Sequence, residues 1–322
     1  MIHLAVAALV GLMWSPLISR AMSPAGRLYE TPWSLWLPAG SFVLASWVRG
    51  WLGLAVAYVT LRAILAGHEL ALWTAIYFAL GVGLLVLVRS VPQEMVRWAL
   101  LGSAALEIAW SFVWPGGTLA QPAFLGAAVA AVLPLAPWWG VPVLGIGIVR
   151  SQSYLAALAV VLGLLVHFPG WWRAILIGTT MIAGLYLLFL APKALTSTRG
   201  RLDVWGAGLA DMNSGAWLVG YGPGGWGTRM WRYEGVIGEV FTAAHHEPLQ
   251  WLYETGLVGC LVLVAWMRQS VSILRRAEPR WRAAFASVAV LSCGFQVFHW
   301  PTVAPVMVLV LGGALHEPGG IE

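Results

Sequence analysis

The chain has 322 residues, of which 60% are hydrophobic and only 10% are charged. An average soluble domain carries about 25% charged residues, so this composition excludes an ordinary soluble globule. The net charge is +5, but the basic residues stand in short gaps between apolar runs. This pattern is typical of orientation signals and lipid headgroup contacts, whereas nucleic-acid binding requires a continuous basic face.

Apolar runs long enough to cross a bilayer recur along most of the sequence, and they predict an all-α, polytopic transmembrane bundle of about 10–12 spans. Strands of a transmembrane barrel would instead alternate in polarity over about 10 residues. The predicted spans are 2–19, 35–48, 51–66, 70–88, 95–114, 119–136, 138–149, 152–168, 171–191, 251–267, 281–298 and 302–315. They divide the chain into N-terminal transmembrane helices (1–191), one long motif-bearing loop (192–250) and C-terminal transmembrane helices (251–322).

The distribution of arginine predicts how the spans are oriented. The gap 268–282 holds Arg268, Arg275, Arg276, Arg280 and Arg282 against one acid, Glu278. The positive-inside rule places this gap in the cytoplasm, and alternation of the spans then places 192–250 on the extracytoplasmic face. That segment carries five cations of its own (Lys193, Arg199, Arg201, Arg229 and Arg232). Because they run against the charge bias, we expect that something other than topology requires them.

Three blocks of the polar segment carry a recognisable pattern: Ser197–Trp205, Gly220–Gly227 and Ala243–Gly259. In this order, and directly before a span, they resemble the O-antigen ligase and O-antigen polymerase family. The matching residues are Arg201, Trp205, Gly220, Gly222, Gly224, Ala244, His245, Leu249, Gln250, Glu254, Gly256 and Gly259. Two positions depart from the family pattern: His246 stands where the family usually has Asn, and Pro248 stands where an aromatic residue is common.

The resemblance implies a membrane glycosyltransferase of the C type that acts on the outer face of a bacterial cytoplasmic membrane. The donor would be a glycan on a polyprenyl diphosphate, and the acceptor a hydroxyl of a glycan or lipid-linked glycan. It implies no nucleotide sugar, no cofactor and no obligatory metal. Cys260 and Cys293 both lie in apolar runs, so they suggest neither a disulfide framework nor a metal cluster.

The residues themselves fit this chemistry. A guanidinium binds a diphosphate bidentately, so Arg201 is a candidate for stabilising the leaving group. His245 is a candidate general base because imidazole accepts a proton near neutral pH. Glu254, or Glu247, is a candidate for orienting its ring. The further candidates for substrate binding are Arg199, Arg229, Arg232, His246, Gly222 and Gly224.

Each candidate also has a structural interpretation. The arginines can contact lipid headgroups, and Arg229 and Arg232 stand beside tryptophans with which they can form cation–π contacts. His246 can cap a helix, Glu254 can pair with an arginine, and the glycines can serve an ordinary turn. Outside the polar segment, Arg62 and Glu107 lie within predicted spans, where we expect them to pair helices.

Two other classes of function stay open from the sequence. The chain is short for the family, so it can be a catalytically reduced relative that serves as an accessory subunit with transmembrane protein partners. A transporter would show inverted repeats and charges at the midplane of the membrane, and the sequence shows neither.

Overall fold

The computed structural model describes residues 51–67, 69–89, 91–113, 122–167, 192–230, 244–294 and 303–316. Every regular element in these ranges is helical, which confirms the all-α prediction. The elements are α3 (Trp51–Ala66), α4 (Glu69–Arg89), α5 (Gln93–Ser111), α6 (Pro122–Val132), the 3₁₀ turn η2 (Leu133–Leu135), α7 (Val141–Ser151), α8 (Tyr154–His167), α10 (Pro192–Asp211), α11 (Ser214–Val219), α12 (Gly225–Arg229), α14 (Glu247–Arg276), α15 (Pro279–Ser292) and α16 (Ala304–Ala314). The predicted spans 2–19, 35–48 and 171–191 lie outside the described residues.

Among the described helices, α14 is the one that is long and apolar enough to cross a membrane. Several other helices are apolar but shorter, including Leu52–Ala66, Pro122–Leu135, Val141–Ser151 and Tyr154–Val166. They coincide with predicted spans, so the helices themselves are confirmed. That each of them crosses a bilayer stays a prediction.

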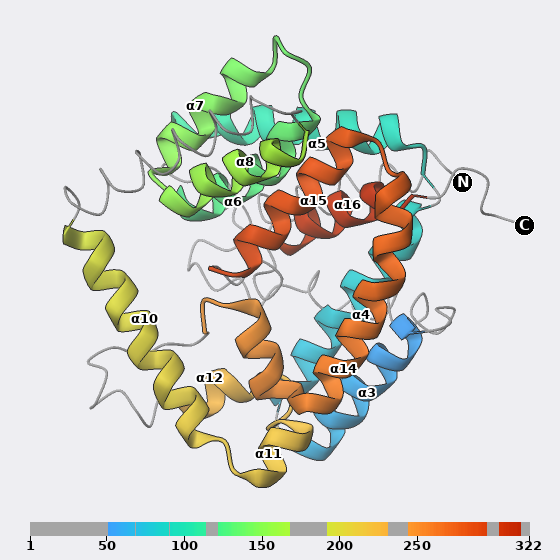
Figure 1. Ribbon diagram of the computed structural model, residues 1–322, viewed down its shortest axis with the longest axis vertical. Helices are drawn as coiled ribbons and strands as arrows, with labels where there is room; N and C mark the ends of the chain where they lie inside the picture. The colour runs from blue at the N-terminus through green and yellow to red at the C-terminus, as the bar shows by residue number, and fades with distance from the viewer. Residues whose placement is uncertain are drawn as a thin grey trace, which may run out of the picture.

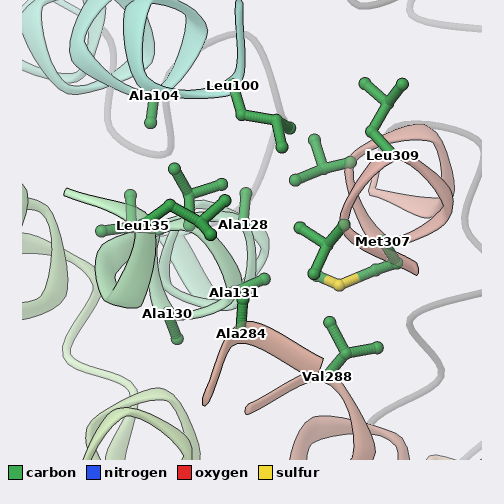
Figure 2. Close-up of a cluster of buried hydrophobic side chains, with 14 of the residues drawn as sticks. Leu100, Ala104, Ala128, Ala130, Ala131, Leu135, Ala284, Val288, Met307 and Leu309 are labelled. Atoms are coloured by element: carbon green, nitrogen blue, oxygen red, sulfur yellow. The ribbon is translucent and has the colours of Figure 1, made fainter. Parts of the chain in front are cut away.

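The main hydrophobic core surrounds α6, all of whose residues from Phe124 to Val132 are buried. Figure 2 shows Ala131 of α6 next to Ala284 of α15, with Met307 of α16 on the same side of the helix. Small residues let helix backbones approach closely, which an apolar bundle needs where packing must replace the hydrophobic effect.

The helices form two groups joined by α14 (Figure 1). Helices α5 to α8, α15 and α16 gather at one end of the molecule, and α10, α11 and α12 lie at the other. Helix α14 is bent: its first part runs toward α11 and α12, and its second part runs from there to the opposite end, where α15 follows after a turn at Ala277 and Glu278. This second group and the first part of α14 hold the described motif-bearing residues.

The polar segment 192–250, which the sequence predicts as a loop, is largely helical in its described part: it contains α10, α11, α12 and the first turn of α14. Helix α10 is polar in composition, but Val204, Gly208 and Met212 follow one another at helical spacing and are buried. A Cβ on Gly208 would lie 2.6 Å from the Trp226 ring, so α10 packs closely against the start of α12. A narrow apolar face therefore makes this segment part of the folded structure.

Candidate functional site

Helix α10 presents Arg201 and Trp205 one turn apart, and each is tied to a distant part of the chain. The Arg201 Nη1 donates a hydrogen bond to the Gly294 carbonyl, just after α15, at 3.2 Å. The Trp205 Nε1 donates to the Ala244 carbonyl at 2.7 Å. Because residues four apart share a helix face, the first and third sequence blocks meet along one side of α10.

His245 lies directly after this contact, in a left-handed backbone conformation with φ +53°. Its side chain is partly buried. Burial, with the nearby Arg201 charge as the second cause, lowers the pKa of His245 from its ordinary 6.5 to about 4. The structure therefore places a neutral imidazole close to a guanidinium whose own pKa is lowered by burial.

His246 begins α14 as its N-cap residue. Its Nδ1 accepts a hydrogen bond from the Leu249 backbone N–H at 3.1 Å, and burial lowers its pKa. Its ring also lies edge-on against Trp205, with the ring centroids 4.9 Å apart. The capping interpretation of this residue is therefore what the structure shows, and a contact with substrate stays a prediction.

Helix α14 is broken at Gly256, whose backbone (φ 66°, ψ −170°) is not helical. The glycine turn fills this break: the Tyr221 N–H donates to the Tyr253 carbonyl at 3.0 Å, and the Gly222 N–H donates to the Glu254 carbonyl at 2.8 Å. The Tyr58 hydroxyl of α3 donates to the Thr255 carbonyl at 2.6 Å. Carbonyls that the break releases from the helix ladder thus gain other donors, as buried backbone groups must.

The glycines of the turn allow backbones to touch. Gly220, Gly222 and Gly224 all have positive φ values, of 71°, 96° and 72°. A Cβ on Gly222 would lie 2.8 Å from that of Ala66 in α3, and the Arg62 Nη2 donates to the Gly220 carbonyl at 2.5 Å. The close approach expected at these glycines is therefore made to α3 and α14. A contact between Gly222 or Gly224 and phosphate stays a prediction.

Arg229 has a protein partner at the end of α10. Its Nε and Nη2 donate to the two carboxylate oxygens of Asp211 at 2.8 and 3.2 Å, which raises the pKa of the guanidinium. The guanidinium carbon lies 3.8 Å from the centroid of the Tyr221 ring, and the Tyr253 hydroxyl donates to Asp211 at 2.5 Å. The cation–π interpretation holds for Arg229, with Tyr221 in place of a tryptophan.

Glu254 is buried in the first part of α14, with 3% of its surface exposed. Its Oε1 accepts from the Gln250 side-chain amide at 3.1 Å, and the Gln250 Oε1 accepts from the Ala244 N–H at 3.1 Å. Glu254 is thus connected, through Gln250, to the residue that precedes His245. Glu247, in the first turn of α14, is also buried.

Two candidates cannot be placed: the Arg199 side chain and the whole of Arg232 lie outside the described residues. In the described ranges, no group of three or more His, Cys, Asp or Glu side chains could hold a metal ion.

Sequence reasoning gave no role to Asp211 or Tyr58, because their partners are 18 and 197 residues away. A tyrosine hydroxyl within an apolar run was the one available signal for Tyr58.

A comparison of the sequence with protein-family models finds no match, and none of the curated proteins matches it either.

Proposed function

We propose that this chain is an integral membrane glycosyltransferase of the O-antigen ligase and polymerase type. It transfers a glycan from a polyprenyl diphosphate to a sugar hydroxyl on the extracytoplasmic face. The observation that carries the proposal is that Arg201 and His245, separated by 44 positions in the sequence, come together at α10: Trp205, one turn after Arg201, donates to the carbonyl of Ala244, the residue before His245. A cation for a diphosphate and a neutral base for a hydroxyl are the two groups that the reaction needs.

In the proposed reaction, the acceptor oxygen forms a bond to the anomeric carbon of the donor while the bond from that carbon to the diphosphate oxygen breaks. The electron pair of the broken bond stays on the diphosphate, whose developing charge Arg201 stabilises. The proton of the acceptor hydroxyl passes to the His245 imidazole and then to water. A guanidinium has five N–H donors in total. Within the described part of the chain, Arg201 uses one of them for the Gly294 carbonyl, so other donors can bind an anion.

The two residues depend on each other electrostatically. Burial and, without an anion, the Arg201 charge oppose protonation of His245, and together they lower its pKa and make the imidazole a weak base. A diphosphate bound at Arg201 would offset that charge and raise the pKa of His245 toward 6.5. The base would then gain strength when the donor is bound, which favours proton transfer in the complex over the free protein.

Contacts between distant segments agree with the predicted sidedness of the membrane spans. The Gln93 amide donates to the Gly313 carbonyl at 2.7 Å, and alternation of the spans puts both residues on the cytoplasmic side. Arg201 meets Gly294, and Arg62 meets Gly220, with all four residues toward the extracytoplasmic side. These pairings support a polytopic arrangement in which the Arg201–His245 site faces outward.

The two departures from the family pattern are conservative in their local chemistry. His246 accepts the Leu249 N–H as the N-cap of α14, a role for which Asn is among the preferred residues. Pro248 stands in the first turn of α14, where a missing N–H costs no helical hydrogen bond. Both positions therefore serve the start of the helix that follows His245.

The proposal is tested by reconstituting the full chain in liposomes with a polyprenyl-diphosphate glycan and a panel of glycan acceptors. We expect transfer, reduced about 10²–10⁴-fold in His245→Ala. His246→Asn preserves a capping side chain and is the matched control, which should retain transfer. Full transfer by His245→Ala would exclude the general-base role. A protein that transfers to no acceptor, and that co-purifies stoichiometrically with other membrane proteins, would be an accessory subunit.

A further inference from the structure

The backbone at His245 requires an explanation beyond its side chain. Among the described residues, His245 and Gln152 are the non-glycine positions with positive φ. The left-handed region is disfavoured for L-amino acids, and it persists where the surrounding structure holds it in place. The contacts on either side of His245 are therefore the ones that can hold this conformation in place.

The residue before His245 is held from two directions. The Ala244 N–H donates to Gln250 Oε1 at 3.1 Å, and the Ala244 carbonyl accepts from Trp205 Nε1 at 2.7 Å. Ala244 itself is buried. The peptide groups on both sides of this alanine are thus fixed by side chains from α10 and α14, and the peptide bond that enters His245 cannot rotate freely.

The residue after His245 is held as well. His246 caps α14 through Leu249, and its backbone carbonyl accepts from the Gln250 N–H at 3.0 Å. The Trp205 ring lies edge-on against the His246 ring, 4.9 Å between centroids. One indole therefore contacts both neighbours of His245, and it does so from the helix face that carries Arg201.

We propose that Trp205 and Gln250 are positioning residues that fix His245 in its left-handed conformation and thereby hold its imidazole beside the Arg201 guanidinium. Their effect on catalysis rests on the proposed function, but the placement of His245 does not. Neither side chain needs to touch a substrate, because each acts through the Ala244 backbone.

Two variants test this on the full chain in detergent micelles. Trp205→Phe keeps an aromatic ring against His246 and removes the N–H that holds Ala244. Gln250→Met keeps the side-chain length and removes both amide hydrogen bonds. Trp217→Phe changes an exposed indole on α11 and serves as the matched control. Melting temperature and gel filtration establish that each variant is folded.

The readout is the pKa of His245, measured by ring-carbon NMR of histidine-labelled protein, with its signal assigned by its loss in His245→Gln. We expect the pKa of His245 to rise by about one unit in both variants, because a released imidazole gains water and moves away from Arg201. The other titratable groups next to it in the chain, His246 and Glu247, are present in every variant. Trp217→Phe should leave the pKa at about 4.

An unchanged pKa of His245 in folded Trp205→Phe and Gln250→Met, even with a lower melting temperature, would reduce both residues to structural support and overturn the proposal. If Trp205→Phe does not fold, Gln250→Met decides by the same criterion. If the pKa shifts in both variants but the unmodified protein transfers no glycan, the proposed function is contradicted and the positioning role stands. If the unmodified protein transfers glycan but the pKa of His245 is unshifted in both variants, only the positioning role is contradicted.

Discussion

A Cβ placed on Gly256 would lie 2.5 Å from the backbone nitrogen of Gly220, so the break in α14 and the glycine turn touch through their backbones. Gly256 has φ 66° and ψ −170°, a combination that is essentially confined to glycine. These two glycines, which lie in different sequence blocks, therefore share one packing requirement.

Gly256→Ala should consequently be severely destabilising. The backbone strain alone costs up to about 3 kcal/mol, and the added methyl would also overlap the Leu218 carbonyl. Thermal unfolding in detergent measures the effect. Gly206→Ala is the matched control, because Gly206 lies in α10 with no atom within 4 Å of an added Cβ; it should raise the free energy of unfolding by up to about 1 kcal/mol. Equal stability of the two variants would contradict this account of the break.

Tyr58→Phe should lower the free energy of unfolding by about 1–3 kcal/mol, because it leaves the Thr255 carbonyl without its 2.6 Å donor at the break in α14. The ring is retained, so packing changes little. The exposed Tyr154 supplies a comparison: Tyr154→Phe should be neutral within about 0.5 kcal/mol. A neutral Tyr58→Phe would show that the released carbonyl does not depend on this hydroxyl.

The two arginines should respond differently to replacement by lysine. Arg229→Lys loses the bidentate contact with Asp211, so we expect a lower melting temperature and an unchanged KM for the donor. Arg201→Lys keeps the charge near His245 but loses the planar fork, so we expect a higher KM for the donor with a smaller effect on melting. Donor KM and melting temperature measured on both variants separate the roles. A donor KM raised by Arg229→Lys would return Arg229 to the substrate site.

The dependence of transfer on pH should carry the signature of a depressed histidine pKa. A base must be neutral to accept a proton, so activity falls as the pH drops through its folded pKa. In kcat/KM, which reports the free protein, this acid limb should lie near pH 4, the pKa of His245. In kcat the limb should lie at higher pH, because the bound diphosphate offsets the Arg201 charge. A kcat/KM limb near 6.5 would contradict the burial of His245, and His245→Ala should show no such limb.

Inorganic pyrophosphate should report the coupling between Arg201 and His245 without any transfer. Its binding at Arg201 is expected to raise the pKa of His245, followed by ring-carbon NMR during titration. Arg201→Gln removes the cation, so its His245 should begin with a higher pKa and no longer respond to pyrophosphate. A response that survives in Arg201→Gln would place the anion elsewhere.

The sequence by itself determined the composition class and the helices that coincide with apolar runs. The chain carries too little charge for a soluble surface, and it has long apolar runs. Both features favoured helices, because a helix satisfies its backbone hydrogen bonds within one segment. The predicted ranges 51–66, 70–88 and 152–168 accordingly agree with α3, α4 and α8 to within two residues. The resemblance carried by the three motif blocks also named Arg201, His245 and Glu254 as catalytic candidates, and their roles stay predictions.

Only the tertiary structure decided what each of these residues does. The glycine turn serves the break in α14, Arg229 binds Asp211, and His246 caps a helix. The first two roles do not follow from spacing, because their contacts join residues 32 and 18 positions apart. The cap joins residues three apart and was one of two interpretations that the sequence left open for His246. Local propensity decides where a helix forms. Packing decides the partner of a buried carbonyl or guanidinium, because any suitable donor or acceptor that packing brings near can complete its hydrogen bonds.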